Sequence, residues 1–215
     1  MGVNGPVTPP YRIETERLVI RCYDPEDAHL LKAAVDSSIE HLLPWMPWAR
    51  FEPQSVEDKM ELCRMFRGQF DLDQNYVYGI FSADETEQLG GSGFHKRANE
   101  GSLEIGYWVA VGAIGQGIAT EVTAVQTRAG FELAGLDRID IQVDPDNDRS
   151  LAIPRKLGFT EEGTLRRRLE SHDEGLPRRD SVVFSMLREE LAGSPCMQYA
   201  YTAYDVLGDP LSSRT

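Results

Sequence analysis

The sequence predicts an α+β fold in which helices flank a mixed, mostly antiparallel central sheet. Three runs of strand length, at 76–82, 88–95 and 104–111, are separated by short turns, which is typical of an antiparallel meander. A helix-length segment separates this meander from a further strand at 138–143, which must therefore run parallel to the strand before it. With 215 residues, 41% of them hydrophobic, the chain can form one domain with a proper core.

The N-terminal part contains one strand and two helices. Residues 1–10 include three prolines and predict a disordered lead. Residues 17–22 alternate between apolar and polar side chains, as a first strand does. Asp24 before Pro25 is typical of a helix start and predicts a helix to about Ser38. Residues 41–50, with two prolines and two tryptophans, predict an irregular aromatic loop, and a second helix begins after Ser55.

The C-terminal half continues with a helix from Ile118 to about Gly135. Its apolar positions recur every three or four residues, so the sequence predicts an amphipathic helix. A short helix ends before Gly158, and strands at 160–168 and 181–187 complete a sheet of six to seven strands. We therefore expect the folded domain to span 11–192. No pattern assigns a structure to the C-terminal tail, 193–215.

The composition excludes several classes of function. A net charge of −13 argues against nucleic-acid and anionic-membrane partners, which bind through cationic patches. It suits a cationic substrate such as an amine, although solubility alone explains it equally well. The three cysteines form no C-x-x-C pair and the histidines show no metal-ligand spacing, so no metal is expected. Reduced thiols and the lack of a long apolar run or signal peptide indicate a cytoplasmic protein.

One stretch, 104–120, combines a strand, a glycine-rich loop and a helix start. Such a loop lets backbone N–H groups approach a phosphate, and the helix N-terminus adds partial positive charge. Ile118 and Ala119 follow the last glycine, where a Walker A loop would have Lys and Ser or Thr. The dinucleotide pattern G-x-G-x-x-G fails as well. The interpretation that remains is a lysine-free pyrophosphate cradle, or a glycine-rich turn without function.

Four short motifs occur in a characteristic order along the chain. They are HLLPWMPW at 41–48, EIGYW at 104–108, IGQGIA at 114–119, and the N-x-x-S of 147–150 leading into KLGF at 156–159. Together they resemble the GNAT superfamily of acetyl-CoA-dependent N-acetyltransferases, and within it the RimJ/RimL type. The resemblance covers about residues 12–191. Gly117 and Ala119 match the Q/R-x-x-G-x-G/A motif, whereas Ile114 replaces its first residue.

The resemblance implies a GNAT fold whose central parallel pair of strands splays apart, with the pantetheine of acetyl-CoA lying between the strands. Backbone groups around Trp108, Val109 and Val111 would bind pantetheine, and Asn147 and Ser150 would also contact the cofactor. The backbone amides that would bind its pyrophosphate are those of Gln116, Gly117, Ile118, Ala119 and Thr120. Trp45 and Trp48 would wall the acceptor site; packing in the core or in a homodimer is the alternative.

Glu104 and Ser150 are the candidate catalytic residues. Acetylation of an amine requires a base, and Glu104 shares one face of its strand with Trp108, where it is suited to proton transfer through water. Its alternative role is a charged strand end. Ser150 would act near the leaving sulfur, and Pro154, which lacks an N–H, would leave the Ser150 carbonyl free. The alternative role of Asn147 and Ser150 is helix capping.

The resulting hypothesis is acetyl transfer from acetyl-CoA to a primary amine by direct attack on the thioester. The acceptor would be a protein N-terminal α-amine or a small cationic amine. Two alternatives remain open at this point, a non-catalytic acyl-CoA-binding sensor and a transferase that uses another donor such as succinyl-CoA.

Overall fold

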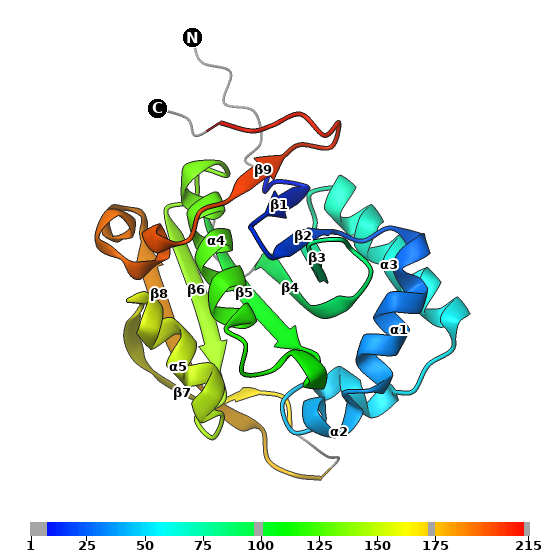
Figure 1. The fold of residues 1–215 in the computed structure, drawn as a ribbon. Helices are drawn as coiled ribbons and strands as arrows, with labels where there is room; N and C mark the ends of the chain where they lie inside the picture. The colour runs from blue at the N-terminus through cyan, green and yellow to red at the C-terminus, as the bar shows by residue number, and fades with distance from the viewer. Residues whose placement is uncertain (1–7, 97–100, 172–174, 213–215) are drawn as a thin grey trace.

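A single nine-stranded sheet organises the computed structural model, which describes residues 8–96, 101–171 and 175–212 (Figure 1). The strand order is β7-β8-β6-β5-β4-β3-β2-β1-β9. The strands are β1 (Arg12–Glu14), β2 (Leu18–Cys22), β3 (Tyr76–Ser82), β4 (Gln88–Lys96), β5 (Ser102–Val109), β6 (Arg138–Val143), β7 (Thr160–Leu169), β8 (Arg179–Leu187) and β9 (Thr202–Tyr204). The α-helices are α1 (Ala28–Asp36), α2 (Ile39–Leu42), α3 (Val56–Asp71), α4 (Ile118–Glu132) and α5 (Asp148–Leu157).

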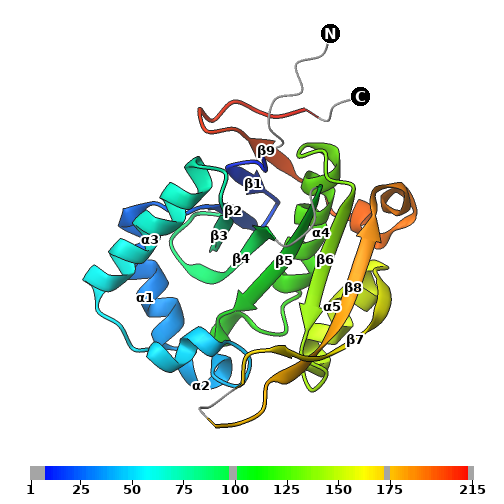
Figure 2. The ribbon, with the colours of Figure 1, turned by 180° about the vertical axis from the view of Figure 1, so that it is seen from behind.

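The parallel pair of β5 and β6 lies in the middle of this sheet, and the other pairings between described strands are antiparallel. The predicted fold class is therefore confirmed. Hydrogen-bonded register between β5 and β6 ends at Glu104 and Asp140, although β5 continues to Val109 and β6 to Val143. Figure 2 shows the two strands diverging beyond this point. The sheet is thus open at its centre.

Helices cover both faces of the sheet. Alternation along β2 directs Ile20 into a core shared with α4 and α5, and Val19 into a second cluster with α1 and α3. Ser55 caps α3, because its hydroxyl accepts a hydrogen bond from the Asp58 N–H at 3.1 Å. The helix after Asp24 begins with a 3₁₀ turn, Pro25–Asp27, before α1.

The sheet has two more strands than the sequence predicts. β1 and β9 have three residues each, too few for a periodic pattern to be recognised, and they pair with each other at one edge of the sheet. The C-terminal segment is therefore part of the fold: 3₁₀ turns at Arg188–Gly193 and Pro195–Gln198 pack near α4, and Cys196 is buried. Most of the expected lead lies outside the described residues, but Pro9 and Pro10 are buried.

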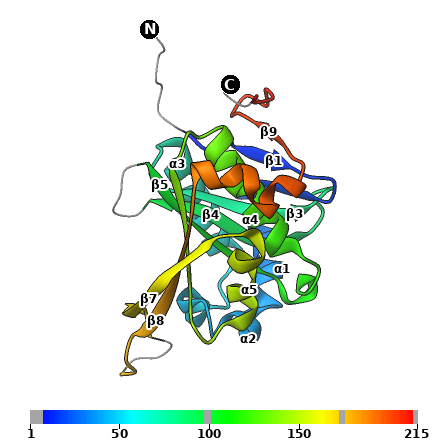
Figure 3. The same cartoon turned by 90° about the vertical axis from the view of Figure 1, so that its left-hand side faces the viewer.

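Helix α4 is buried on nearly all sides rather than along one stripe. The sheet, α5 and the C-terminal 3₁₀ turns all contact it, so Thr123, Gln126 and Thr127 are buried together with the apolar positions. In Figure 3 the same C-terminal turns lie beside α4, and β7 and β8 extend beyond the rest of the sheet. Within the described residues, no helix has the length and apolar character needed to span a bilayer.

All three cysteines are free and buried. Burial raises the pKa of the Cys63 thiol to about 12 and that of Cys22 to about 11, and it also raises the pKa of Cys196. Because thiolate is the reactive form, we expect the folded protein to resist iodoacetamide at pH 8 and to label at three thiols after unfolding. Rapid labelling of the native protein would contradict this expectation.

The free energy of unfolding should also fall above about pH 8.5, where the cysteines exposed in the unfolded chain ionise.

Candidate active site

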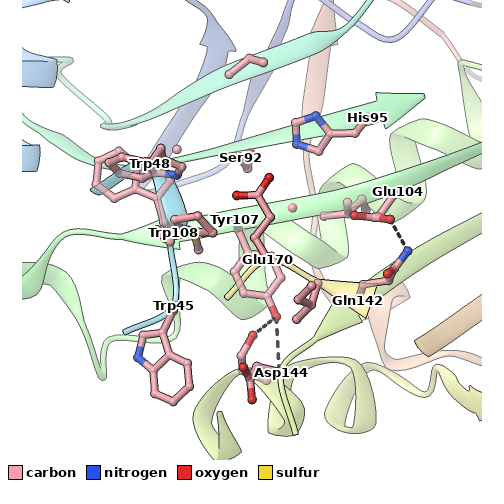
Figure 4. A pocket seen from close by; sticks show the side chains of 18 of the residues that line it. Trp45, Trp48, Ser92, His95, Glu104, Tyr107, Trp108, Gln142, Asp144 and Glu170 are labelled. Atoms are coloured by element: carbon pink, nitrogen blue, oxygen red, sulfur yellow. Dashed lines mark hydrogen bonds between the residues drawn. The ribbon is translucent and has the colours of Figure 1, made fainter. Parts of the chain in front are cut away.

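A cavity of about 840 Å³ opens beside the splayed strands. Its walls come from α1, α3, the segment 45–54, strands β3 to β6 and the hairpin between β7 and β8. Figure 4 shows two sides of it, with Trp45, Trp48 and Trp108 on one side and Glu104, His95 and Gln142 on the other. The cavity thus joins an aromatic wall to a group of polar side chains.

Glu104 lies at the point where β5 and β6 separate. The residue is 8% exposed, and its Oε2 accepts a hydrogen bond from Gln142 Nε2 at 2.7 Å. The Ser181 hydroxyl donates to Gln142 Oε1 at 3.3 Å, which orients the amide so that its NH₂ group faces the carboxylate. Glu104 is therefore held in one position at the mouth of the gap.

Alternation along β5 separates two groups of functional side chains. Glu104 and Trp108 face α1 and α3, whereas Tyr107 faces the core shared with α4 and α5. On the Glu104 face, the His95 ring lies over Gly106, where an added Cβ would come within 3.1 Å of Nε2. The absence of a side chain at Gly106 therefore gives this ring room to lie against the sheet.

Tyr107 and Ser150 meet across the gap between β5 and α5. The Asn147 side chain caps α5 by accepting from the Ser150 N–H at 3.1 Å. The Tyr107 hydroxyl lies 3.0 Å from Ser150 Oγ and donates to the Ser150 carbonyl at 3.3 Å. Pro154 lies within α5 and supplies no N–H to that carbonyl, so the phenol takes its place as donor. Tyr107 was not predicted as a site residue from the sequence, although the EIGYW motif contains it.

Burial raises the pKa of Tyr107 to about 12. The phenol therefore keeps its proton throughout the physiological pH range and can act as a hydrogen-bond donor. Together with Ser150 it places two hydroxyl groups on the α5 side of the gap, opposite Glu104.

The glycine loop before α4 has the geometry of an anion cradle. Gly117 is the N-cap of α4 with φ of 78°, a left-handed conformation that favours glycine. The first N–H groups of α4 have no acceptor within the helix, so those of Ile118, Ala119 and Thr120 are available to a phosphate. Arg17 supports the loop by donating to the Gln116 carbonyl at 3.2 Å and to Glu121 at 2.6 Å.

We expect Arg17→Ala to weaken coenzyme A binding about tenfold, because the loop loses the charge-assisted hydrogen bonds that hold it. Isothermal titration calorimetry with coenzyme A measures this change. Arg64→Ala is the matched control, since Arg64 forms an exposed ion pair with Glu61 on α3. Equal affinities of the wild type and Arg17→Ala would show that the loop needs no such support.

The backbone N–H groups near the end of β5 face in different directions. The Ala110 N–H donates to the Leu89 carbonyl of β4 at 2.8 Å, so by alternation the Trp108 N–H also faces β4 and the Val109 N–H faces the gap. The Val111 N–H donates to Ser38 Oγ at 2.9 Å. A contact from Val111 to pantetheine would therefore need its carbonyl group.

The structure brings six of the thirteen predicted site residues into one cavity. Its lining includes Trp45, Trp48, Glu104, Trp108, Asn147 and Ser150. Trp48 packs edge-on against Trp108 with ring centroids 5.8 Å apart, so the two tryptophans form one wall. Val109, Val111 and the cradle at 116–120 are not among the lining residues.

Other polar residues of the cavity besides Tyr107 were not predicted from the sequence either, among them His95, Asn75 and Glu170. His95 Nδ1 lies 2.9 Å from Asn75 Oδ1, and Glu170 enters from the β7–β8 hairpin with Arg50 at 3.7 Å. Sequence spacing gave no signal for them, because they come from distant parts of the chain. In the described residues no group of three or more potential ligands is arranged to hold a metal ion.

Comparison with known proteins agrees with this geometry. The family model described as acetyltransferase (GNAT) domain matches residues 17–160. An uncharacterized N-acetyltransferase, YoaA of Bacillus subtilis, is 29% identical over 82% of this chain and 96% of its own length. The [ribosomal protein uS5]-alanine N-acetyltransferase of Escherichia coli is 27% identical over 72% of this chain and 81% of its own.

Solved structures share the fold of this chain. Mycobacterium smegmatis RimJ in complex with CoA-disulfide superposes with a TM-score of 0.76 and 27% identity, over 89% of this chain and 95% of that one. RimL, a ribosomal L7/L12 α-N-protein acetyltransferase, shares the fold with a TM-score of 0.71 at 21% identity. The family model matches more than half of the chain, and the chain has both the glycine cradle and the opening beside Glu104. The chain therefore belongs to the acetyltransferase (GNAT) family.

Proposed function

We propose that this protein transfers the acetyl group of acetyl-CoA to a primary amine, which attacks the thioester directly. The observation that carries the proposal is the central gap, with Glu104 on one face of β5 and the Tyr107–Ser150 pair on the other. A base and a pair of hydrogen-bond donors on opposite sides of one opening suit a reaction between molecules entering from two sides.

The residues present fit coenzyme A. The N–H groups of Gln116 to Thr120 would hold the pyrophosphate at the α4 N-terminus, and the Val109 N–H would bind pantetheine in the gap. Asn147 and Ser150 would contact the same molecule from α5. Bound acetyl-CoA supplies the thioester carbonyl, the electrophile of the reaction. The Val109 N–H would also stabilise negative charge on that carbonyl oxygen.

Glu104 prepares the amine by accepting its proton through a water molecule. At pH 7, removing the proton from an α-amine costs about 1.4 kcal/mol, against roughly 4.6 kcal/mol for a lysine side chain. An α-amine therefore demands less of the base. This difference and the names of the E. coli and RimL relatives favour a protein N-terminal α-amine over a lysine.

Ser150 would donate a hydrogen bond from its hydroxyl to the leaving sulfur. Tyr107, whose hydroxyl donates to the Ser150 carbonyl, would hold Ser150 in place for this contact. With its pKa at about 12, Tyr107 keeps its proton and so remains a hydrogen-bond donor.

The acceptor would enter along the tryptophan wall, to which Trp45, Trp48 and Trp108 all contribute. A small cationic amine is the second candidate acceptor, and it is favoured by the net charge of −13.

We place the reaction in the cytoplasm, where buried thiols stay reduced. A homodimer is a further expectation, which native mass spectrometry tests.

The deciding experiment is a mass-spectrometric screen of acetyl-CoA and succinyl-CoA against N-terminal peptides, a lysine peptide with a blocked N-terminus, and small polyamines. We expect acetylated α-amines from acetyl-CoA and little product from the blocked peptide. Product formed only from succinyl-CoA would show that succinyl-CoA, and not acetyl-CoA, is the donor. Tight coenzyme A binding without any acylated amine would favour a sensor.

A further inference from the structure

His95 is a second titratable side chain in the acceptor part of the cavity, and its position is built by the fold. It comes from the end of β4, and its ring lies over Gly93 and Gly106, where added Cβ atoms would meet it at 3.0 and 3.1 Å. Asn75 Oδ1 lies 2.9 Å from Nδ1. When that amide oxygen accepts, the proton of the neutral imidazole resides on Nδ1, and Nε2 is the basic nitrogen.

His95 is also the cross-strand partner of Glu104. The two residues stand opposite each other in the register of β4 and β5, and both line the cavity. Side chains at directly opposite positions have Cβ atoms about 5 Å apart. Figure 4 shows both on the same side of the cavity, away from the tryptophan wall. An imidazole and a carboxylate therefore occupy one corner of the acceptor site.

We propose that the proton which Glu104 draws from the acceptor amine through water passes on to His95, and that the Glu104 carboxylate beside it then stabilises the imidazolium. The inference rests on the proposed function. An ammonium and a thioester give an amide, a thiol and one proton. The nitrogen–carbon bond forms as the carbon–sulfur bond breaks, the electron pair leaves with sulfur, and the thiolate takes up a proton. The second proton of the ammonium is the one assigned here to His95.

Imidazole is better matched to this proton than a carboxylate. An α-amine has an ordinary pKa near 8, imidazole about 6.5 and glutamate about 4.3. As residue types, an imidazole is therefore closer in basicity to an α-amine than a carboxylate is. A general base is most effective when its pKa is near the working pH. Glu104 then contributes through its negative charge and the water it orders.

Other charged groups share the cavity with His95 among the described residues. Glu170 and Arg168 come from the β7–β8 hairpin, and two ion pairs, Lys59–Glu52 and Arg179–Asp144, lie in the walls. Glu104 is the charged residue in direct cross-strand register with the imidazole. It favours the imidazolium that forms during turnover.

The test is the pH dependence of kcat in the wild type and in His95→Gln. Wild-type kcat should rise with pH as His95 loses its proton and then level off, as expected for an imidazole base in the bound complex. Glutamine can still bond to Asn75 but cannot accept a proton. We expect its kcat to fall about 100-fold and to keep rising with pH through the range of the amine itself. A kcat within threefold of wild type with the same profile would overturn the proposal.

Chemical rescue separates a proton acceptor from a structural residue. In His95→Ala, Asn75 remains to hold an added imidazole, so imidazole should restore activity at pH 7, whereas His95→Ala/Asn75→Ala should respond less. His29→Ala, at an exposed position on α1, is the control and should match the wild type. Coenzyme A affinity and thermal midpoint check that each variant folds. Failure of rescue together with an unchanged pH profile rejects the role of His95. A wild type that acetylates no amine rejects the proposed function itself.

Discussion

Replacing Glu104 with glutamine should lower kcat by about 100- to 10,000-fold, the range typical of a lost general base. The amide keeps the size of the side chain but cannot take a proton, and it also presents NH₂ where Gln142 Nε2 now donates to a carboxylate. Coenzyme A binding should be unchanged, because the cradle before α4 is not among the residues that line the Glu104 cavity. Steady-state kinetics with an α-amine peptide and calorimetry with coenzyme A measure the two effects.

Glu57→Gln is the matched control for this variant, since Glu57 is an exposed carboxylate in the first turn of α3. It should retain wild-type kinetics. If Glu104→Gln and Glu57→Gln acetylate the peptide at the same rate, Glu104 is a charged strand end and not part of the proton path. The same comparison in the His95 variants shows whether carboxylate and imidazole act on one proton, because their effects would then be far from additive.

The second large effect concerns stability. Lys59 and Glu52 form an ion pair whose side chains are 1% and 3% exposed, and Glu52 also accepts from the Gln54 N–H at 3.1 Å. Removing one partner leaves a buried charge without compensation. We therefore expect Glu52→Gln to lower the free energy of unfolding by about 3–5 kcal/mol in urea titrations. A loss below about 1 kcal/mol would mean that water reaches Lys59.

Replacing both partners tests the explanation. Glu52→Gln/Lys59→Met removes the unpaired charge and fills the space with an apolar side chain of similar length, so it should recover most of the lost stability. The pair joins the segment 45–54, which carries Trp45 and Trp48, to α3. We therefore expect Glu52→Gln also to bind the acceptor less tightly. Exposed pairs such as Arg64–Glu61 should contribute little in the same assay.

Local patterns in the chain were sufficient for much of the fold. The meander of β3 to β5, the helix after Gly117 and the parallel strand β6 were all predicted, because periodicity and turn residues act within a few positions of each other. The short motifs likewise identified the family. β1 and β9 were missed, since three residues carry too little periodicity and their pairing joins opposite ends of the chain.

The sequence by itself determined the order of the larger elements and the glycine-rich loop before α4, and it singled out Glu104 on the central strand. Only the tertiary structure decided which side chains share the site. The Tyr107 contact with Ser150, His95 seated over two glycines beside Glu104, and the buried Lys59–Glu52 pair depend on the register between strands and on packing between distant segments. No local propensity encodes such contacts. They follow from the positions that the whole sheet and its helices impose.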